Sequence, residues 1–469
     1  MMTYALSSAR GAGPVYRQLC DAVRGDIRAG RIAPDARLPS KRALAAQLGV
    51  SVLTVETAYA QLLSEGWIYA RPRSGHFATP VAAPPRARPA ERAARPAPLA
   101  GAAAGPPALD LAGGKADPEF FPFTVWAKIV RRLFAEKRAE LLAPTPPAGA
   151  PELRAAIASH LRGFRGMDVD PERVFVAAGA ETLYAMLVRA LGAERPWAVE
   201  NPGHRTIAAV YRQCGADVRP VRVDASGLDP AALEASGAAV AHVSPAHQYP
   251  TGAVAPAARR YEWLAWAASR SGRVLVEDDY DSELRASGLP IPTLQSLDSA
   301  GCVVHLETFS RSLAPTLRVG CLIAPEPLLP RFREVFGPLS CTVPNLIQFA
   351  LADFLSEGHF ARHLARTRTR CRRVRAELLQ ALREGPLSGR AAVSEDRAGP
   401  HLLLALRTRR SDAEISARAA RLGLRVRMLS SFYDGPAPRE AAGRIVLDYA
   451  SLAPGSAAGT AALLAELAL

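Results

Sequence analysis

Two stretches of this chain carry side chains suited to holding a phosphate. Residues 176–181 form a short apolar run that turns into a helix at a glycine, and the free amides and dipole of a helix N-terminus favour an anion. Further along, two hydroxyls and a guanidinium offer charge-assisted hydrogen bonds to the same kind of group. The residues concerned are Gly179, Ala180 and Glu181 in the first stretch, and Thr308, Ser310 and Arg318 in the second.

A cluster of acids at residues 277–283 directly follows an apolar run, Val274–Val276. A buried carboxylate at this point could keep a heteroaromatic ring nitrogen protonated and make that ring an electron sink. An ordinary acidic loop and a metal site are the alternatives, but no pair of histidines with ligand spacing accompanies the acids. We therefore expect no metal here.

The elements that must position these groups alternate between strand and helix from about residue 109 onward. Such alternation is typical of an α/β domain with a mostly parallel sheet. After Pro344, one long arginine-rich helix is expected from about Leu346 to Leu382. The expected strands include Val174–Ala177, Trp197–Val199, Val240–Val243, Val274–Val276 and Cys302–Leu306.

The first 79 residues have the pattern of a separate basic unit. An apolar stripe over residues 16–27 predicts one helix, Ser40 can cap a second, and residues 49–51 turn into a third, Val52–Ser64. Two short strands around a basic turn follow, which completes a winged helix-turn-helix that would bind double-stranded DNA in the major groove. The expected DNA contacts are Ser40, Lys41, Arg42, Ser51, Thr54, Thr57, Arg71, Arg73 and Gly75.

Composition supports this division of the 469 residues. The net charge of +14 suits a polyanionic partner. Residues 80–108, rich in Pro, Ala and Arg, cannot bury a core and predict an extended linker between domains 1–79 and 109–469. Six scattered cysteines, without a signal peptide or a run of about 18 apolar residues, indicate a reduced cytoplasmic protein without a membrane span.

Residues 14–79 resemble the GntR-type DNA-binding domain. The likeness rests on Leu38–Ala45, on Ser51 with the Thr54-Val55 pair, and on Gly75. One position departs from the family, which usually carries arginine directly after the turn serine, where this chain has Val52. Operator specificity therefore does not transfer from the family.

Nearly the whole chain resembles the MocR/GabR-type regulators, which join a GntR-type domain to a class I, fold-type I aminotransferase-like domain. The likeness includes Asn201–Gly203, His247–Gly252, Glu277–Glu283 and Ser312–Pro315. It implies a homodimer and pyridoxal 5'-phosphate as cofactor. It also implies roles for single residues: Asp278 beside the pyridine nitrogen, Tyr280 near the ring oxygen, and Thr308, Ser310 and Arg318 on the phosphate.

Arg311 stands where this resemblance places the lysine that forms a Schiff base with the cofactor aldehyde. A guanidinium stays protonated and cannot do so. No lysine follows Lys137, and Lys115 is the only other candidate near the expected site. Three explanations stand open: drift in a chain with 54 Arg and 4 Lys, a pocket in which Arg311 clamps a phosphate or carboxylate, or a sequence error.

Other departures from the family also cluster around the expected cofactor. His204 takes the place of a tyrosine near the ring face, and Glu181-Thr182 replaces a polar pair at the phosphate helix. On the last strand, Val446 stands roughly where transaminases place a carboxylate-binding arginine, with Arg444 two residues away. The cofactor is therefore expected to bind non-covalently at most.

The leading hypothesis is a DNA-binding transcriptional regulator without enzyme activity. Its C-terminal domain would sense a small molecule, with pyridoxal phosphate, pyridoxamine phosphate or an amino acid as candidates, and would set the geometry of a dimer. Two alternatives are a working pyridoxal-phosphate-dependent aminotransferase with an accessory DNA-binding domain, and a cofactor-free protein that binds DNA constitutively.

Overall fold

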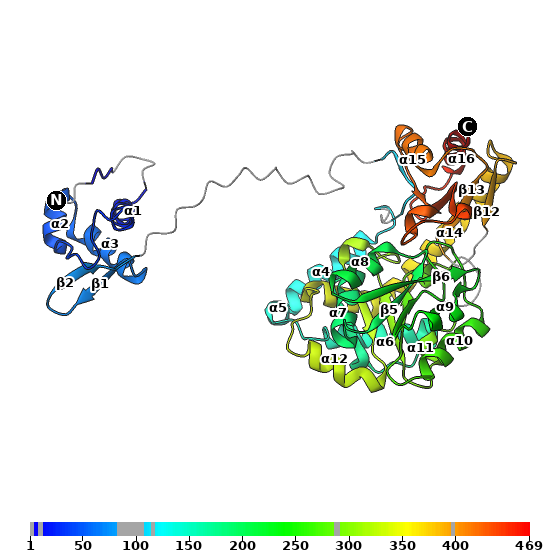
Figure 1. The fold of residues 1–469 in the computed structure, drawn as a ribbon, viewed down its shortest axis with the longest axis horizontal. Coiled ribbons are helices and arrows are strands. Elements are labelled where there is room, and N and C mark those ends of the chain that lie inside the picture. The colour runs from blue at the N-terminus through cyan, green and yellow to red at the C-terminus, as the bar shows by residue number, and fades with distance from the viewer. Residues whose placement is uncertain (1–3, 8–12, 82–106, 114–117, 286–290, 395–398) are drawn as a thin grey trace. The chain divides into compact units, whose positions relative to one another are not determined.

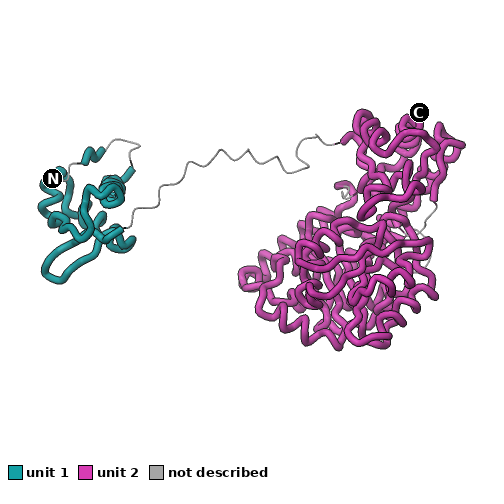
Figure 2. Tube along the Cα trace, viewed as in Figure 1, with its two compact units in different colours: residues 1–103 teal, residues 104–469 magenta. Residues whose placement is uncertain are grey.

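The structure is a computed structural model that describes residues 4–7, 13–81, 107–113, 118–285, 291–394 and 399–469 (Figure 1). The chain divides into two compact units, residues 1–103 and residues 104–469 (Figure 2). Most of the expected linker, residues 80–108, lies outside the described residues, as does Lys115. The domain boundaries at 79 and 109 therefore stay predictions.

The first unit is a winged helix-turn-helix, as the sequence predicted. Its helices are α1 (Val15–Arg28), α2 (Lys41–Leu48) and α3 (Val52–Ser64), and strands β1 (Ile68–Arg71) and β2 (Gly75–Ala78) form the antiparallel wing. The Ser40 and Ser51 side chains accept hydrogen bonds from backbone amides three residues on and so cap α2 and α3. The core comprises Leu19, Val23, Leu44, Val55, Tyr59, Leu62 and neighbouring apolar residues.

The second unit is built on an eight-stranded sheet in the order β4-β11-β10-β9-β8-β5-β6-β7. Neighbours are parallel except where β7 or β11 takes part. The strands are β4 (Val174–Ala177), β5 (Pro196–Asn201), β6 (Asp217–Asp224), β7 (Gly227–Leu228), β8 (Val240–Val243), β9 (Val274–Asp279), β10 (Val303–Thr308) and β11 (Gly320–Ile323).

Helices cover both faces of this sheet, because its central strands are apolar on both sides. In β4, Phe175 and Ala177 pack with α7 (Ala180–Leu191), α8 (Arg205–Gln213) and α12 (Leu329–Phe336). The alternate residues of β4, Val174 and Val176, pack with helices on the opposite face. Those helices include α4 (Phe123–Glu136), α6 (Pro151–Arg165) and α13 (Asn345–Ser356), with α9 (Pro230–Ala235) and α10 (Ala257–Ala268) further along the sheet.

The prediction of one long arginine-rich helix from Leu346 to Leu382 is wrong, because the structure has two helices in this stretch. Helix α13 ends at Ser356, and α14 (His359–Glu384) begins after Gly358. Gly358 has a φ of 71°, a left-handed conformation that a continuing α-helix does not allow and that glycine adopts readily. The prediction missed this break because the residues on either side continue the helical pattern.

The C-terminal part adds a smaller antiparallel sheet in the order β12-β13-β16-β15. Its strands are β12 (Ala391–Ser394), β13 (His401–Leu406), β16 (Arg444–Asp448) and β15 (Arg427–Met428), and it packs against α14, α15 (Asp412–Arg421) and α16 (Ala457–Ala468). Close by, β14 (Leu424–Arg425) pairs in parallel with β3 (Leu109–Asp110). Two short helices, α5 (Arg138–Leu142) and α11 (Leu294–Leu297), complete the unit.

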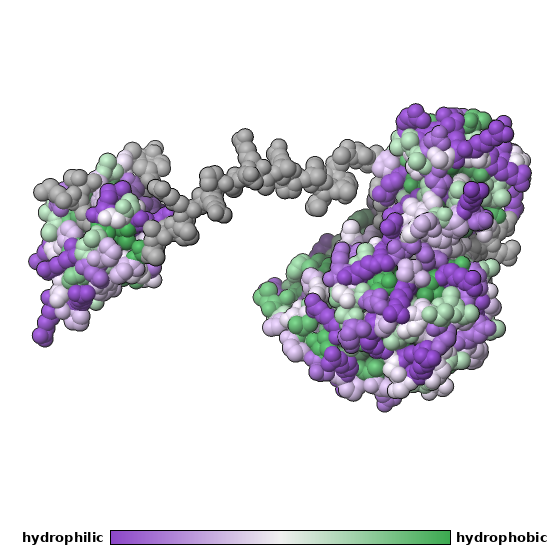
Figure 3. Space-filling view, in the orientation of Figure 1, coloured by the Kyte–Doolittle hydropathy of each residue, from purple (hydrophilic) through white to green (hydrophobic). Residues whose placement is uncertain are grey.

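Two surface properties bear on partners. Large exposed apolar side chains gather on α4 and α5, where Figure 3 shows hydrophobic colour at one corner of the second unit. They are Phe123, Phe134 and Leu142, the last 89% exposed. Among the described residues, no helix is both long enough and apolar enough to cross a membrane.

Candidate ligand site and DNA-binding face

The predicted ligand residues meet at one edge of the large sheet. Strands β4, β5, β8, β9 and β10 run parallel, so the loops after them share the edge where ligands bind in open α/β sheets. Thr308 ends β10 and pairs with Gly320 of β11, which in turn pairs with Ala177 at the end of β4. This register brings Thr308 to the same edge as the turn at Gly179.

Asp278, near the end of β9, is a buried carboxylate. It accepts hydrogen bonds from the Tyr184 hydroxyl at 2.8 Å and from His242 Nε2 at 3.1 Å. Burial alone would raise the pKa of Asp278, but the hydrogen bonds and charge of His242, with Tyr184, hold it below its ordinary value. The group is therefore ionised at neutral pH, as a partner of a protonated ring nitrogen must be.

Among the residues predicted to bind a phosphate, Arg318, the one with a positive charge, is already paired with the carboxylate of Glu181. Gly179 precedes α7 with a φ of 79°, and a Cβ there would lie 2.8 Å from Arg318 Cζ. Glycine thus lets the Arg318 guanidinium approach the turn, where it pairs with the exposed Glu181 carboxylate. Thr308 is buried and Ser310 is half-buried. An incoming phosphate must compete with Glu181 for Arg318.

Arg311 pairs with Asp448 at the end of β16. Asp448 is buried, accepts a second hydrogen bond from the Ala450 amide at 2.9 Å, and lies against Gly113, where a Cβ would be 2.4 Å from Asp448 Oδ2. Burial opposes the charge on Arg311, but Asp448 and Asp281 outweigh burial and raise the pKa of the guanidinium. The pair joins the loop after β10 of the large sheet to β16 of the small one.

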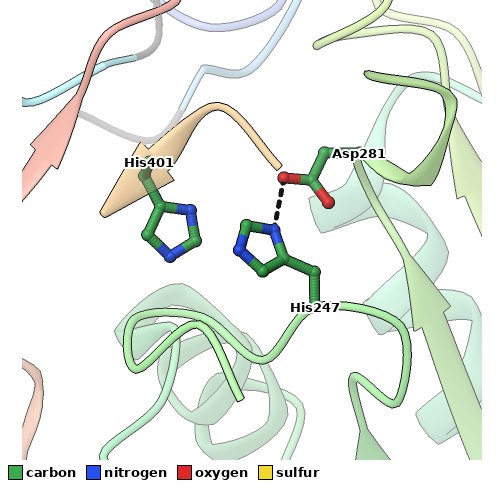
Figure 4. A group of neighbouring side chains, drawn as sticks. All are labelled: His247, Asp281 and His401. Carbon is green, nitrogen blue, oxygen red and sulfur yellow. Dashed lines mark hydrogen bonds and ion pairs between the residues drawn. The ribbon is translucent and has the colours of Figure 1, made fainter. Parts of the chain in front are cut away.

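Beside Arg311 lies a buried group of His247, Asp281 and His401, drawn in Figure 4. His247 Nδ1 is 2.8 Å from Asp281 Oδ2, and the two imidazole rings stack with centroids 4.2 Å apart. Tyr280, expected near the ring oxygen, has its hydroxyl 3.1 Å from His247 Nδ1. Residues from the loops after β8 and β9 and from the start of β13 therefore meet behind the ligand site.

The same three side chains have donor types that bind divalent metals, and their ligand atoms lie within 4.8 Å of one another. Electrostatics oppose such an ion. The Arg311 charge acts on Asp281 and on His401, so a dication would enter beside an existing cation. Burial, His247 and Arg311 also lower the pKa of His401 well below its ordinary value, so His401 is neutral. That the chain binds no metal stays a prediction.

A cavity of about 380 Å³ opens next to this site. The loop after β5 and helix α8 form one wall, with His204 at the start, and Phe432 and Asp434 of the C-terminal part form another. The walls are joined by hydrogen bonds, from the Gly203 amide to the Phe432 carbonyl at 3.2 Å and from the Asp434 amide to Asn201 Oδ1 at 2.9 Å. His204 and His242 both line the cavity, so it reaches the surroundings of Asp278.

The strand register identifies a guanidinium near this cavity that the sequence did not single out. Arg427 on β15 lies directly opposite Val446 on β16, and side chains of opposed residues share a face of the sheet. Val446 is buried with Phe432, and the Arg427 guanidinium lies 5.9 Å from the Phe432 ring centroid. Burial raises the pKa of Tyr249, while Arg427 and Arg311 lower it, which places Arg427 near that phenol.

The predicted DNA contacts lie on two elements and the wing of the first unit. Lys41 and Arg42 begin α2, and Lys41 pairs with Glu56 of α3 at 2.5 Å. Arg71 ends β1 with its guanidinium 4.6 Å from the Phe77 ring centroid. The exposed wing residues Arg73 and Gly75 have φ values of 58° and 105°, which a tight turn requires. Ser40, Ser51, Thr54 and Thr57 lie at the helix ends or on α3.

Four residues around the ligand site were missed by the sequence reasoning: Asp448, His401, Tyr184 and Arg427. His401 and Asp448 come from the smaller sheet, and no spacing in the sequence links them to Arg311. Tyr184 sits on the buried face of α7 and has the pattern of an ordinary core residue. A polar side chain in an apolar strand, as at Asp448, was the one available signal.

Comparison with known proteins covers both units. Residues 15–77 match the gntR family of bacterial regulatory proteins, and residues 109–417 match aminotransferase class I and II. The chain is 34% identical over 422 residues to the HTH-type transcriptional regulator YhdI of Bacillus subtilis, covering 90% of this chain and 89% of that protein. It is 33% identical over 465 residues to the probable rhizopine catabolism regulatory protein MocR of Rhizobium meliloti, covering 94% and 91%.

A solved structure also resembles the second unit. An archaeal alanine:glyoxylate aminotransferase superposes with a TM-score of 0.69 at 24% identity, covering 77% of this chain and 90% of that one. This likeness shows the fold. The predicted combination of a winged helix-turn-helix with a fold-type I, mostly parallel aminotransferase-like domain is confirmed.

Proposed function

Because this chain belongs to the MocR/GabR-type family of DNA-binding transcriptional regulators, we propose that its aminotransferase-like domain is a ligand sensor without transaminase turnover. The observation that supports the proposal is the Arg311–Asp448 ion pair, at the position where the resemblance to the family expects the cofactor lysine. A guanidinium that is half-buried, paired and held protonated offers no nucleophilic amine. The protein would act in the cytoplasm, where its DNA lies.

The residues present fit pyridoxal phosphate as a non-covalent ligand and do not fit it as a covalent one. When bound, this cofactor supplies an electron-withdrawing ring and a phosphate handle. Asp278 would hold the ring nitrogen, while Thr308, Ser310, Arg318 and the amides at Gly179 and Ala180 would hold the phosphate. Glu181 weakens the phosphate position because it already pairs with Arg318.

We further propose that the effector carries a carboxylate that Arg427 binds. Val446 stands on β16 roughly where transaminases place a carboxylate-binding arginine. Arg427 on the neighbouring strand β15 lies opposite Val446 and places a guanidinium on the same face of the sheet. Its neighbours Tyr249 and Phe432 offer a phenol and an aromatic wall. An amino acid, among the candidate effectors, has the required group. Thermal-shift titration with β-alanine and glutamate, repeated on Arg427→Met and on Arg439→Met as the matched exposed control, tests this.

A homodimer would use the exposed apolar corner of α4 and α5. Phe123, Phe134 and Leu142 leave an apolar patch in water that a second copy would cover. A dimer also matches the two half-sites that helix-turn-helix proteins bind. Sedimentation velocity of Leu142→Asp beside Leu53→Asp, an exposed leucine in the other unit, tests whether this corner holds the dimer: only the first should yield monomer.

The test of the regulator itself is a mobility-shift assay with the purified full chain and the DNA upstream of its own gene. Specific binding that changes when pyridoxal phosphate, pyridoxamine phosphate or an amino acid is added supports a sensor. Specific binding that no ligand alters supports the constitutive, cofactor-free alternative. Transaminase turnover by the native protein would contradict the proposal and restore the enzyme alternative.

A further inference from the structure

The recognition helix α3 presents apolar side chains where a protein that reads DNA usually presents polar ones. Val52 and Leu53, its first two residues, are 45% and 70% exposed. Neither belongs to the core of the unit, which takes Val55, Ala58, Tyr59 and Leu62 from this helix; Leu53 lies on the opposite face of α3 and Val52 at the edge of the core stripe. Two adjacent exposed apolar side chains at the start of this helix are suited to contact with an apolar group of a partner.

The polar groups on the same face already have partners within the unit. The Thr54 hydroxyl is 2.8 Å from the Ser51 hydroxyl, and the Thr57 hydroxyl donates to the Leu53 carbonyl at 2.9 Å. Glu56 is held by Lys41 at 2.5 Å. The hydroxyls keep free lone pairs, so the distinguishing feature of this face is its aliphatic surface: the Val52 and Leu53 side chains and the methyl groups of the two threonines.

Charge around this face identifies the partner as DNA. A hollow next to α3 is lined by Arg37, Lys41 and Arg42 together with Val52 and Glu56. The wing adds the exposed Arg71 and Arg73. Such a ring of cations positions a phosphate backbone but carries no sequence information. The apolar start of α3 is therefore the part that would meet base edges in the major groove.

Among the base pairs, only those containing thymine present a methyl group in the major groove. We infer that this protein selects its operator through thymine C5-methyl groups packed against Leu53 and Val52. The inference rests on the DNA-binding function and goes beyond it, because it names what the recognition helix reads. Direct hydrogen bonding to guanine, which arginine provides elsewhere, is replaced by shape and apolar contact.

The experiment starts from selection of bound sequences out of a random duplex library by the full-length protein. Thymines in the enriched half-site are then replaced one at a time by uracil, which removes only the methyl group. Each contacted thymine should lose about fourfold in affinity on replacement, the equivalent of one buried methyl-sized group. Leu53→Ala should reduce the difference between thymine and uracil duplexes, while Leu339→Ala, an exposed leucine in the other unit, should keep it.

A second variant tests for a gained base preference and so does not depend on a loss of affinity. Val52→Arg supplies a guanidinium at the start of α3 and should shift the selected half-site toward guanine. Uracil duplexes that bind as well as thymine duplexes overturn the inference. So does a Leu53→Ala protein that weakens on both duplexes equally and changes its sedimentation, since Leu53 would then contact protein. Failure to enrich any sequence overturns DNA binding itself and the inference with it.

Discussion

A double-mutant cycle on Arg311 and Asp448 tests the ion pair between the two sheets of the second unit. Asp448→Asn leaves the Arg311 guanidinium, whose side chain is 20% exposed, without its partner carboxylate. Removing one member of a buried pair costs about 3–5 kcal/mol. Because Arg311 is not fully buried and Asp281 also acts on it, we expect the lower end, about 3 kcal/mol.

The assay is thermal unfolding of the full chain, followed by circular dichroism. A loss of about 3 kcal/mol should lower the Tm of the second unit by roughly 6 °C, at about 2 °C per kcal/mol for a large domain. Arg311→Met should cost a similar amount, because it leaves Asp448 buried without its cation. The double variant Arg311→Met/Asp448→Asn should recover most of that loss, since buried charges removed together leave no unpaired ion.

Asp217→Asn provides the control, because Asp217 pairs with Arg219 on the surface with both side chains well exposed. That variant should melt within about 2 °C of the parent, as surface pairs contribute about 0–1 kcal/mol. An Asp448→Asn protein with an unchanged Tm, or strictly additive losses in the double variant, would refute the ion pair as the group that holds Arg311.

Three further predictions follow from the same site. Arg311→Lys should acquire bound pyridoxal phosphate that borohydride fixes to residue 311 in a peptide mass map, whereas the native protein should release the cofactor on dialysis. Glu181→Gln should free Arg318 from its pair and tighten pyridoxal phosphate binding by roughly threefold to tenfold, from about 1 kcal/mol for an exposed pair; unchanged affinity measured by fluorescence titration would show that phosphate binds elsewhere. Burial raises the pKa of Glu200 from 4.5 to about 7, so the folded state binds this proton more tightly than the unfolded state, and the stability that this contributes is full below pH 4.5 and lost as pH rises through 7. Glu200→Gln should therefore reduce the pH dependence of the free energy of urea unfolding over that window by up to ~3 kcal/mol. A pH dependence that persists in the variant would belong to another group.

Much of the fold follows from patterns that act over short distances along the chain. The caps at Ser40 and Ser51 and the apolar stripe of α1 each operate within a few turns of helix. The strands β4 and β8 have the expected bounds, and β10 was anticipated to within two residues, because buried strands are continuous apolar runs. The winged helix-turn-helix and the α/β class could therefore be predicted from sequence. The break at Gly358 could not, because helix-forming residues continue on both sides of it.

The chemistry at the centre of the site depended on contacts between distant residues. The sequence by itself determined that Arg311 has no reactive amine and that Asp278 follows a buried strand. Only the tertiary structure decided that Arg311 meets Asp448, 137 residues later, and that Arg427 faces the site from the strand opposite Val446. Strand order and the packing of one sheet against another decide such pairs, and local periodicity carries no record of them.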